Sequence, residues 1–184
     1  MSESTFRKTL DMDLVFEKLP ISEGQVVAEL GCGHLGHFVF PLAKLVGSNG
    51  ILYAVDIIPE ILDDIKKRAY IEKLPQIKTV WTNLEVFKGA NIKSGTVEIA
   101  FLINVLNQSE KKLDILRETA RLLKVGGQLV LIDWKLDAPN FGPPIKNRLS
   151  PAVVADLAAV AQTAAVDSIL VVELRLEACC SAQP

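Results

Sequence analysis

The sequence predicts an α/β protein with a doubly wound, mostly parallel sheet and helices on both faces. Apolar, strand-like runs alternate with amphipathic helical segments along most of the 184 residues. The run at 97–103 is nearly continuously apolar, which is typical of a parallel strand covered on two faces. A glycine-rich turn at 31–36 follows the first apolar run of the chain, at 26–30. Sheets of this kind commonly bind ligands at such a turn. These three observations favour a Rossmann-like architecture.

Two rounds of the alternation occupy the N-terminal half. Apolar residues at helical spacing predict an amphipathic leading helix that ends at Pro20. Pro41 is tolerable because it falls in the first turn of the next helix, and Pro59 opens another. The expected elements, in order, are helix 6–19, strand 26–30, helix 38–46, strand 51–56 and a helix beginning at Pro59.

The C-terminal half continues the pattern. A long helix at 109–123 is expected to turn Leu113, Leu116, Ala120 and Leu123 inward and to be closed by Gly126-Gly127. Pro and Gly residues make 135–149 a loop, and Ser150-Pro151 supplies an N-cap and a first-turn proline. The remaining elements are strands 77–82, 97–103, 128–133 and 166–176, and a helix at 151–161.

Composition narrows the class of protein. With 49% hydrophobic residues and 23% charged residues, residues 1–184 fit one globular domain. The net charge is −2 and the basic residues form no single run, so the sequence indicates no nucleic-acid footprint and favours a small-molecule substrate. A polar N-terminus and the short first apolar run predict neither a signal peptide nor a membrane span, so a cytoplasmic location is expected.

The cysteines and histidines do not predict a metal site. One of the three cysteines lies in the glycine turn and two are adjacent, at Cys179-Cys180, which is the spacing of neither a disulfide framework nor a zinc site. His34 and His37 are three residues apart but have no carboxylates nearby in the sequence. We therefore expect reduced thiols and no bound metal.

The glycine turn predicts a nucleotide-type cofactor pocket. Gly31, Gly33 and Gly36 follow a strand, and Asp56 lies twenty residues beyond the third glycine, at the end of the next strand. Glycines let the backbone approach a ligand closely, and a carboxylate at this place accepts hydrogen bonds from a ribose diol. Dinucleotides and S-adenosylmethionine both use such a layout, so the turn alone leaves both classes open.

Three segments resemble sequence motifs of a known family. Residues 29–33 (ELGCG), 53–56 (YAVD) and 122–130 (LLKVGGQLV) resemble the first, second and sixth motifs of class I S-adenosylmethionine-dependent methyltransferases. The resemblance runs from about residue 23 to 148 and is closest to the small quinone-biosynthesis-like branch. It implies the class I methyltransferase fold, S-adenosylmethionine as cofactor and a small or lipophilic acceptor substrate. Residues 1–20 would then be a leading helix, 21–134 the cofactor-binding core and 135–184 the acceptor loop and C-terminal elements.

The resemblance also implies which residues bind the cofactor. Glu29 would approach the methionine amino group, Asp56 would hold both ribose hydroxyls, and Asn83 would stand where an aspartate commonly caps the adenine amino group. The complete expected set is Glu29, Gly31, Cys32, Gly33, His34, Asp56, Ile57, Asn83, Leu84 and Asn104. The sequence identifies no catalytic residue, which agrees with methyl transfer because that reaction depends mainly on aligning two reactants.

Acceptor contacts in this family come from the leading helix and from the loops after the fourth and fifth strands. The corresponding residues here are Phe16, Asn107, Trp134, Lys135, Phe141 and Arg148. Asn104-Val105-Leu106-Asn107 replaces the Asn-Pro-Pro-Tyr tetrad of the nucleic-acid amino methyltransferases, so an adenine amine is not the expected acceptor.

The C-terminal tail departs from the family. Family members usually add an antiparallel seventh strand between the fifth and sixth, whereas residues 177–184 are short and lack aromatic residues. We expect the last strand to be abbreviated, within 175–180, or missing. A missing strand would leave open pairing groups that a second copy could cover in a homodimer.

Two alternative functions remain at this stage. A dinucleotide-dependent oxidoreductase would use the same glycine turn, but no catalytic tyrosine-lysine pair is recognisable. A degenerate methyltransferase-like protein would bind the cofactor without turnover, which the short tail favours and the intact Glu29, Gly31, Gly33 and Asp56 oppose.

Overall fold

The computed structural model describes residues 15–16, 19, 21–134, 136, 142–150 and 166–174, the last of these by backbone alone. The predicted helix at 151–161, the tail from 175 onward and most of the predicted leading helix lie outside these residues. Val15 and Phe16 are helical, as expected within the leading helix.

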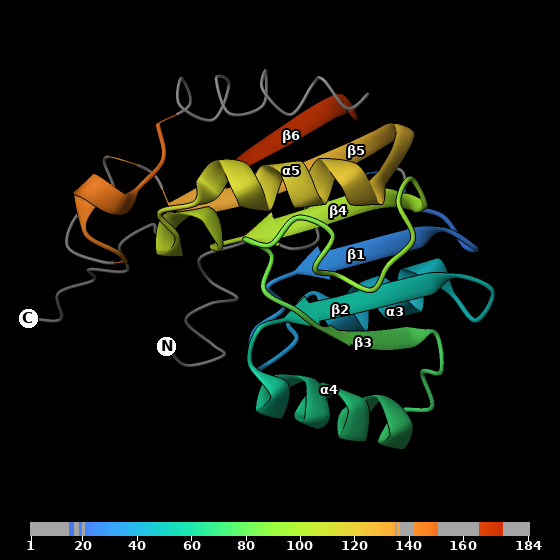
Figure 1. Ribbon diagram of the computed structural model, residues 1–184. Helices are drawn as coiled ribbons and strands as arrows, with labels where there is room; N and C mark the ends of the chain where they lie inside the picture. Colours follow the sequence, from blue (N-terminus) through green and yellow to red (C-terminus); the bar gives the residue numbers. More distant parts are fainter. Residues whose placement is uncertain are drawn as a thin grey trace, which may run out of the picture.

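Six strands form one sheet in the order β3-β2-β1-β4-β5-β6, and every neighbouring pair is parallel (Figure 1). Because the strand order reverses between β1 and β4, the crevice for a ligand lies at the carboxyl ends of these strands. The strands are β1 (Val26–Leu30), β2 (Ile51–Asp56), β3 (Ile77–Trp81), β4 (Val97–Ile103), β5 (Leu123–Trp134) and β6 (Val166–Leu174).

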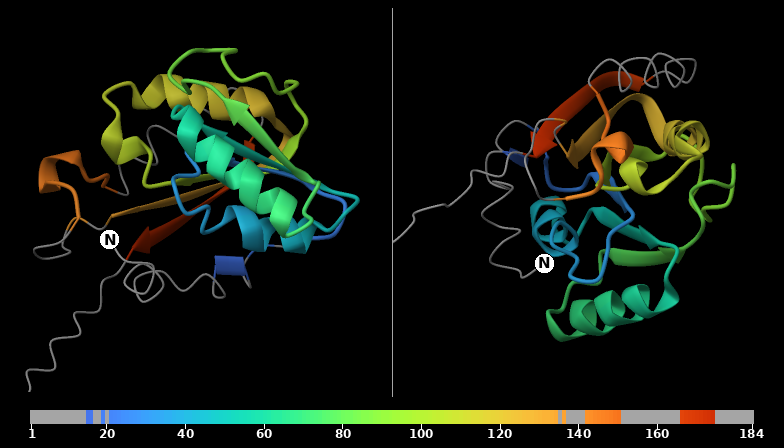
Figure 2. Two further views of the ribbon diagram at one scale, coloured as in Figure 1. Left: turned by 90° about the horizontal axis from the view of Figure 1, so that it is seen from below. Right: turned by 90° about the vertical axis from the view of Figure 1, so that its left-hand side faces the viewer.

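Helices cover both faces of the sheet (Figure 2). On one face, α3 (Val39–Val46) and α4 (Pro59–Ile71) pack on a core that includes Val27, Leu52 and Phe101. On the other face, α5 (Lys112–Leu122) packs with Leu30, Leu102 and Leu131. Two short 3-10 helices complete the described elements: η1 (Leu106–Gln108) follows β4, and η2 (Ile145–Asn147) lies between β5 and β6 in the sequence. The predicted Rossmann-like fold class is confirmed.

Two details around α5 differ from the expectations. Leu113 is 39% exposed rather than inward, because the buried face of the helix passes through Ile115, Leu116 and Glu118 instead. The helix ends at Leu122, and Gly126-Gly127 lie within β5, where the register with β4 jumps between Leu123 and Gln128. Gly126 has a φ of 75°, so it makes a bulge in the strand rather than a helix terminus.

The pairing of the last described strand shows whether an antiparallel strand lies between the fifth and sixth strands. β6 pairs directly and in parallel with β5 from Val166 to Leu174. No antiparallel strand therefore stands between the fifth and sixth strands. The antiparallel strand is thus missing from the place that it occupies in the family.

Of the helices that the structure describes, none is long and apolar enough to cross a membrane. Within the same part of the chain, no three His, Cys, Asp or Glu side chains gather closely enough to hold a metal ion.

Candidate functional site

A cavity of about 440 Å³ lies at the carboxyl ends of β1, β2 and β3. Seven of the ten residues expected to bind the cofactor line it: Gly31, Gly33, His34, Asp56, Ile57, Asn83 and Leu84. Glu29, Cys32 and Asn104 do not line the cavity. Sequence reasoning missed several of its other lining residues, among them Ile61, Thr82, Glu85, Val105, Gln108 and Ser109.

The glycine turn bends the chain back over the end of β2. The N–H groups of Gly31 and Cys32 both donate to the carbonyl oxygen of Val55, at 2.8 and 3.0 Å. Gly31 has a φ of 83°, and a Cβ there would lie 2.5 Å from Cγ2 of Val105. Gly33 has a φ of 64°, but a Cβ there would meet no atom within 4 Å. Gly31 is thus fixed by close packing, whereas Gly33 borders open space in the cavity.

Asp56 joins this turn to the start of α4. Its Oδ2 accepts a hydrogen bond from Gly33 N–H and its Oδ1 accepts one from Ile58 N–H, each at 3.0 Å. The residue is 7% exposed and lines the cavity. Each carboxylate oxygen can accept further hydrogen bonds, so Asp56 can still bind a diol.

Glu29 lies next to this group on β1 and is 3% exposed. Burial and, next, the nearby Asp56 carboxylate raise the pKa of Glu29 well above its usual value, although a hydrogen bond from Val39 N–H opposes this. Its Oε2 has no hydrogen-bond partner. Because an unpaired buried carboxylate oxygen is costly, this atom is suited to a donor that arrives with a ligand.

Cys32 is buried in the turn, with Sγ 4.0 Å from Asp56 Oδ2. Burial, then the carboxylates of Glu29 and Asp56, raise the pKa of the Cys32 thiol. The thiol is therefore protonated and unreactive. His34 is exposed at the rim of the cavity.

The segment after β3 forms the opposite wall. Asn83 Oδ1 accepts a hydrogen bond from Glu85 N–H at 2.9 Å, which fixes the amide above Leu84. One lone pair of this oxygen is used by the turn and the other is left for a ligand. Leu84 is 6% exposed and gives the wall an apolar surface.

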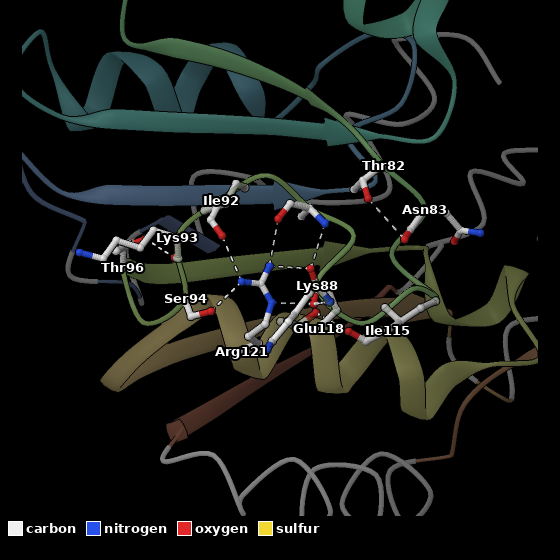
Figure 3. Close-up of polar contacts among 12 residues, drawn as sticks. Thr82, Asn83, Lys88, Ile92, Lys93, Ser94, Thr96, Ile115, Glu118 and Arg121 are labelled. Carbon is white, nitrogen blue, oxygen red and sulfur yellow. Dashed lines mark hydrogen bonds and ion pairs between the residues drawn. The ribbon is translucent and has the colours of Figure 1, made fainter.

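A buried ion pair fastens this wall to α5 (Figure 3). Arg121 donates to Glu118 and to the backbone carbonyls of Ala90 and Ile92, and Glu118 accepts from the N–H groups of Lys88 and Ala90. Burial raises the pKa of Glu118, but the hydrogen bonds from Arg121, Lys88 and Ala90 outweigh it, so the net pKa is lowered. The spacing of Glu118 and Arg121 suits a pair on one helix, but its burial was not predictable, because the loop that covers the pair meets the helix only in the fold.

Asn104 follows β4 with a φ of 55°, in the left-handed region. Its N–H donates to Ile132 O, its own carbonyl accepts from Gln108 Nε2, and its Oδ1 is buried without a partner. Such backbone conformations in non-glycine residues occur often at functional sites.

Two of the residues expected to contact the acceptor, Asn107 and Trp134, lie just after β4 and at the end of β5. Asn107 and Trp134 are buried there, and Gly142 packs so closely on the Trp134 ring that a Cβ would lie 2.6 Å from it. Arg148 is 8% exposed and donates to Pro143 O. Phe16 packs edge-on against Phe38, while Lys135 and Phe141 lie outside the described residues.

Comparison with known proteins decides the family. A family model described as a methyltransferase domain matches residues 21–170. The chain belongs to this family. The match confirms the predicted methyltransferase family, whereas the quinone-biosynthesis-like branch stays a prediction.

Two curated relatives are methyltransferases. The chain is 27% identical over 130 residues to aklanonic acid methyltransferase DauC of Streptomyces sp. strain C5, covering 68% of this chain and 59% of that protein. It is 32% identical over 123 residues to a tRNA N(3)-methylcytidine methyltransferase of Schizosaccharomyces pombe, covering 64% of this chain and 46% of that protein. The chain thus spans about half the length of these relatives.

A solved structure shares the fold. A SAM-dependent methyltransferase from Aquifex aeolicus superposes with a TM-score of 0.77 at 23% identity, over 86% of this chain and 82% of that one. At this identity the likeness supports the methyltransferase fold and carries no information about the acceptor.

Proposed function

We propose that this protein binds S-adenosylmethionine in the cavity beside the glycine turn and transfers its methyl group to a small or lipophilic acceptor. The observation that carries the proposal is the arrangement of Gly33 and Asp56. The carboxylate holds the turn through Gly33 N–H, while open space remains where a side chain at position 33 would point. This arrangement suits a ribose placed against the backbone.

The neighbouring residues fit the rest of the cofactor. The unpartnered Oε2 of Glu29 suits the amino group of the methionine part, since a buried ammonium ion would supply the missing donor. Leu84 offers an apolar surface and Asn83 a free lone pair for the adenine. The backbone around Gly31 supplies the floor of the cavity. Cys32 and His34 would contact the cofactor through the main chain of the turn.

The cofactor supplies an activated methyl group on a sulfonium ion. The protein contributes alignment and the exclusion of water, which together can lower a barrier by about 7–11 kcal/mol. Asp56 and the glycine turn orient one reactant, and the ends of β4 and β5 would orient the other. Methyl transfer does not depend on a general base when the nucleophile already has a free lone pair, and such a base contributes only about 10²–10⁴-fold.

A small or lipophilic acceptor is favoured by the buried apolar residues near the ends of β4 and β5, among them Leu106 and Trp134. One relative is named for aklanonic acid, a small molecule, and another for a tRNA. With a net charge of −2, this chain lacks the basic surplus that RNA binding normally uses. A homodimer and a cytoplasmic location stay predictions from the sequence.

The first test is calorimetric titration with S-adenosylhomocysteine and, separately, with NADH. We expect micromolar binding of S-adenosylhomocysteine alone. Binding of NADH alone would refute the cofactor assignment. Binding of S-adenosylhomocysteine without turnover on a broad panel of acceptors would instead support the degenerate cofactor-binding protein.

The site assignment is tested by Asp56→Ala. Removing charged hydrogen bonds worth about 1.5–3 kcal/mol should weaken S-adenosylhomocysteine binding by ~10–100-fold. Asp64→Ala is the control, because Asp64 is exposed on α4 and pairs only with the exposed Lys67. An unchanged affinity in a folded Asp56→Ala protein would exclude this cavity as the site.

A further inference from the structure

Asp133, near the end of β5, is a buried carboxylate that the proposed cofactor site does not use. The residue is 7% exposed. Its Oδ1 accepts hydrogen bonds from Asn107 Nδ2 at 2.8 Å and from Trp134 N–H at 2.7 Å. Its Oδ2 is buried and has no hydrogen-bond partner. Two donors therefore fix the direction of the carboxylate and leave one oxygen without a donor.

The charge balance around Asp133 favours a neutral partner. Burial raises the pKa of Asp133, and the hydrogen bonds from Asn107 and Trp134 N–H and the positive charge of Lys112 oppose that rise. Lys112 begins α5 and donates to Ser109 O. Because this cation already faces Asp133, a second cation would be repelled, and an anion would meet the carboxylate itself.

Apart from Asn107 and Lys112, the side chains on the face of the sheet that carries Asp133 form an apolar cluster. Asp133 continues the face of β5 that carries Leu129 and Leu131, and these pack in one cluster with Leu106 and Leu149. A ligand that satisfies Oδ2 must therefore present one hydrogen-bond donor on an apolar body, since further polar groups would be buried without partners.

We propose that Asp133 accepts a hydrogen bond from a hydroxyl group of the methyl acceptor, with Asn107 as its positioning residue, so that the acceptor is an apolar hydroxyl compound. This inference rests on the methyltransferase function proposed above and narrows its substrate class. In the apolar surroundings of Oδ2, a hydrogen bond from such a hydroxyl is stronger than it would be in water.

The test compares three probes of nearly equal size on protein saturated with S-adenosylhomocysteine: 1-naphthol, 1-methoxynaphthalene and 1-naphthoate. Calorimetry gives each dissociation constant. We expect 1-naphthol to bind at least about tenfold more tightly than 1-methoxynaphthalene, since a hydrogen bond to a charged group contributes at least this factor. 1-Naphthoate should bind most weakly.

Asp133→Asn is the decisive variant. Its amide oxygen can still accept from Asn107, while its NH₂ group takes the place of Oδ2 and turns an acceptor into a donor. The preference for 1-naphthol over its methyl ether should disappear, with S-adenosylhomocysteine affinity unchanged. Asp64→Asn, on the exposed face of α4, should keep the preference.

The outcomes separate the two proposals. Failure of the wild type to bind S-adenosylhomocysteine refutes the function itself. If that ligand binds but 1-naphthol does not bind, is not preferred, or stays preferred in Asp133→Asn, the role of Asp133 is refuted. Should Asp133→Asn fail to fold, Asn107→Ala replaces it and is expected to reduce the preference by about threefold or more; an unreduced preference would again overturn the proposal.

Discussion

Gly33 and Gly24 have the same backbone requirement but different surroundings. Both have a positive φ, 64° and 87°, and a Cβ at either position would meet nothing within 4 Å. Only Gly33 lines the cavity. An added methyl group at Gly33 should therefore obstruct a ligand, whereas one at Gly24 should not.

We expect Gly33→Ala and Gly24→Ala to lose similar stability, about 1–2 kcal/mol, because alanine disfavours a positive φ. Only Gly33→Ala should also weaken S-adenosylhomocysteine binding, by at least about tenfold. Urea unfolding and calorimetry measure the two effects. Equal affinities in both variants would contradict the placement of the ligand against Gly33.

The buried carboxylate of Glu29 should lower the free energy of unfolding while it contributes to ligand binding. Because burial raises the pKa of Glu29 in the fold, the folded state holds this proton more tightly than the unfolded chain does. The contribution of Glu29 is therefore least favourable above the raised pKa and improves as the pH falls through it toward the unfolded value near ~4.3.

Glu29→Gln removes the buried charge, so this variant should be more stable than the wild type at pH 8, and the difference should shrink toward pH 5. It should also bind S-adenosylhomocysteine about tenfold more weakly, since a charged acceptor is lost. Urea unfolding at several pH values tests the first statement. A Glu29→Gln protein that is less stable at pH 8 would show that Oε2 already has a favourable partner.

Single residues were predictable where a motif names them. Gly31, Gly33 and Asp56 follow from spacing along strands, and all three line the cavity. Asp133 was not predictable, because in the sequence it is only a polar residue ending an apolar run. Its carboxylate is oriented by a hydrogen bond from Asn107, which lies 26 positions away in the sequence and contacts Asp133 only in the folded protein.

At the scale of elements, the pair Glu118–Arg121 fixes the loop after β3 to α5. The side chains are 0% and 9% exposed, and the Nη2–Oε1 distance is 2.6 Å. A second acid–arginine pair with the same spacing on the same helix, Asp114–Arg117, is solvent-exposed at 40% and 57%. α5 thus carries its own control for the effect of burial.

Glu118→Gln should cost about 3–5 kcal/mol of stability, because it leaves Arg121 buried with an unpaired charge. Asp114→Asn should cost less than about 1 kcal/mol. Amide hydrogen exchange at Lys88 and Ala90 should accelerate in the first variant alone. Since the pKa of Glu118 is lowered in the fold, its contribution should be present above the unfolded value and disappear as the pH falls through the lowered one.

Five of the six strands were predictable to within two residues at each end, because their apolar runs are short and bounded by glycine, proline or polar residues. β5 is the exception, since it begins at Leu123, five residues before the predicted start. The surroundings of α5 were harder to predict. Periodicity favoured Leu113 as an inward residue, but the buried pair uses the face that contains Glu118 and shifts the interior surface away from Leu113. A buried charge is invisible to a pattern that counts only apolar residues.

At the scale of the whole molecule, the sheet ends on β6 without the antiparallel strand that family members usually place between β5 and β6. One edge of β6 pairs with β5, and on its other side the structure describes no strand within 21–134, 142–150 or 166–174. Open backbone groups on an edge strand can pair with another copy. From the sequence, an abbreviated and a missing strand both stayed open, and residues 175–184 lie outside the described part of the chain.

We expect a homodimer, and sedimentation analysis should give about twice the chain mass of 20.1 kDa. Val171→Pro, in the middle of β6, should dissociate the homodimer if the outer edge of β6 carries the pairing, because proline removes one backbone N–H donor. Lys67→Ala is the control, because Lys67 is exposed on α4, away from β6, and its replacement should leave the dimer intact. A monomer at all concentrations would exclude the dimer.

The strand order also determines when each strand meets its neighbours during translation. β1 is made first yet lies between β2 and β4, and β4 begins only at Val97. At about 5–20 residues per second on the ribosome, β1 waits on the order of 3–13 seconds for its second neighbour. During that interval the β1-α3-β2 unit must protect the unpaired backbone edge of β1 by itself. The glycine turn within it is therefore shaped before most of the walls of the cavity exist.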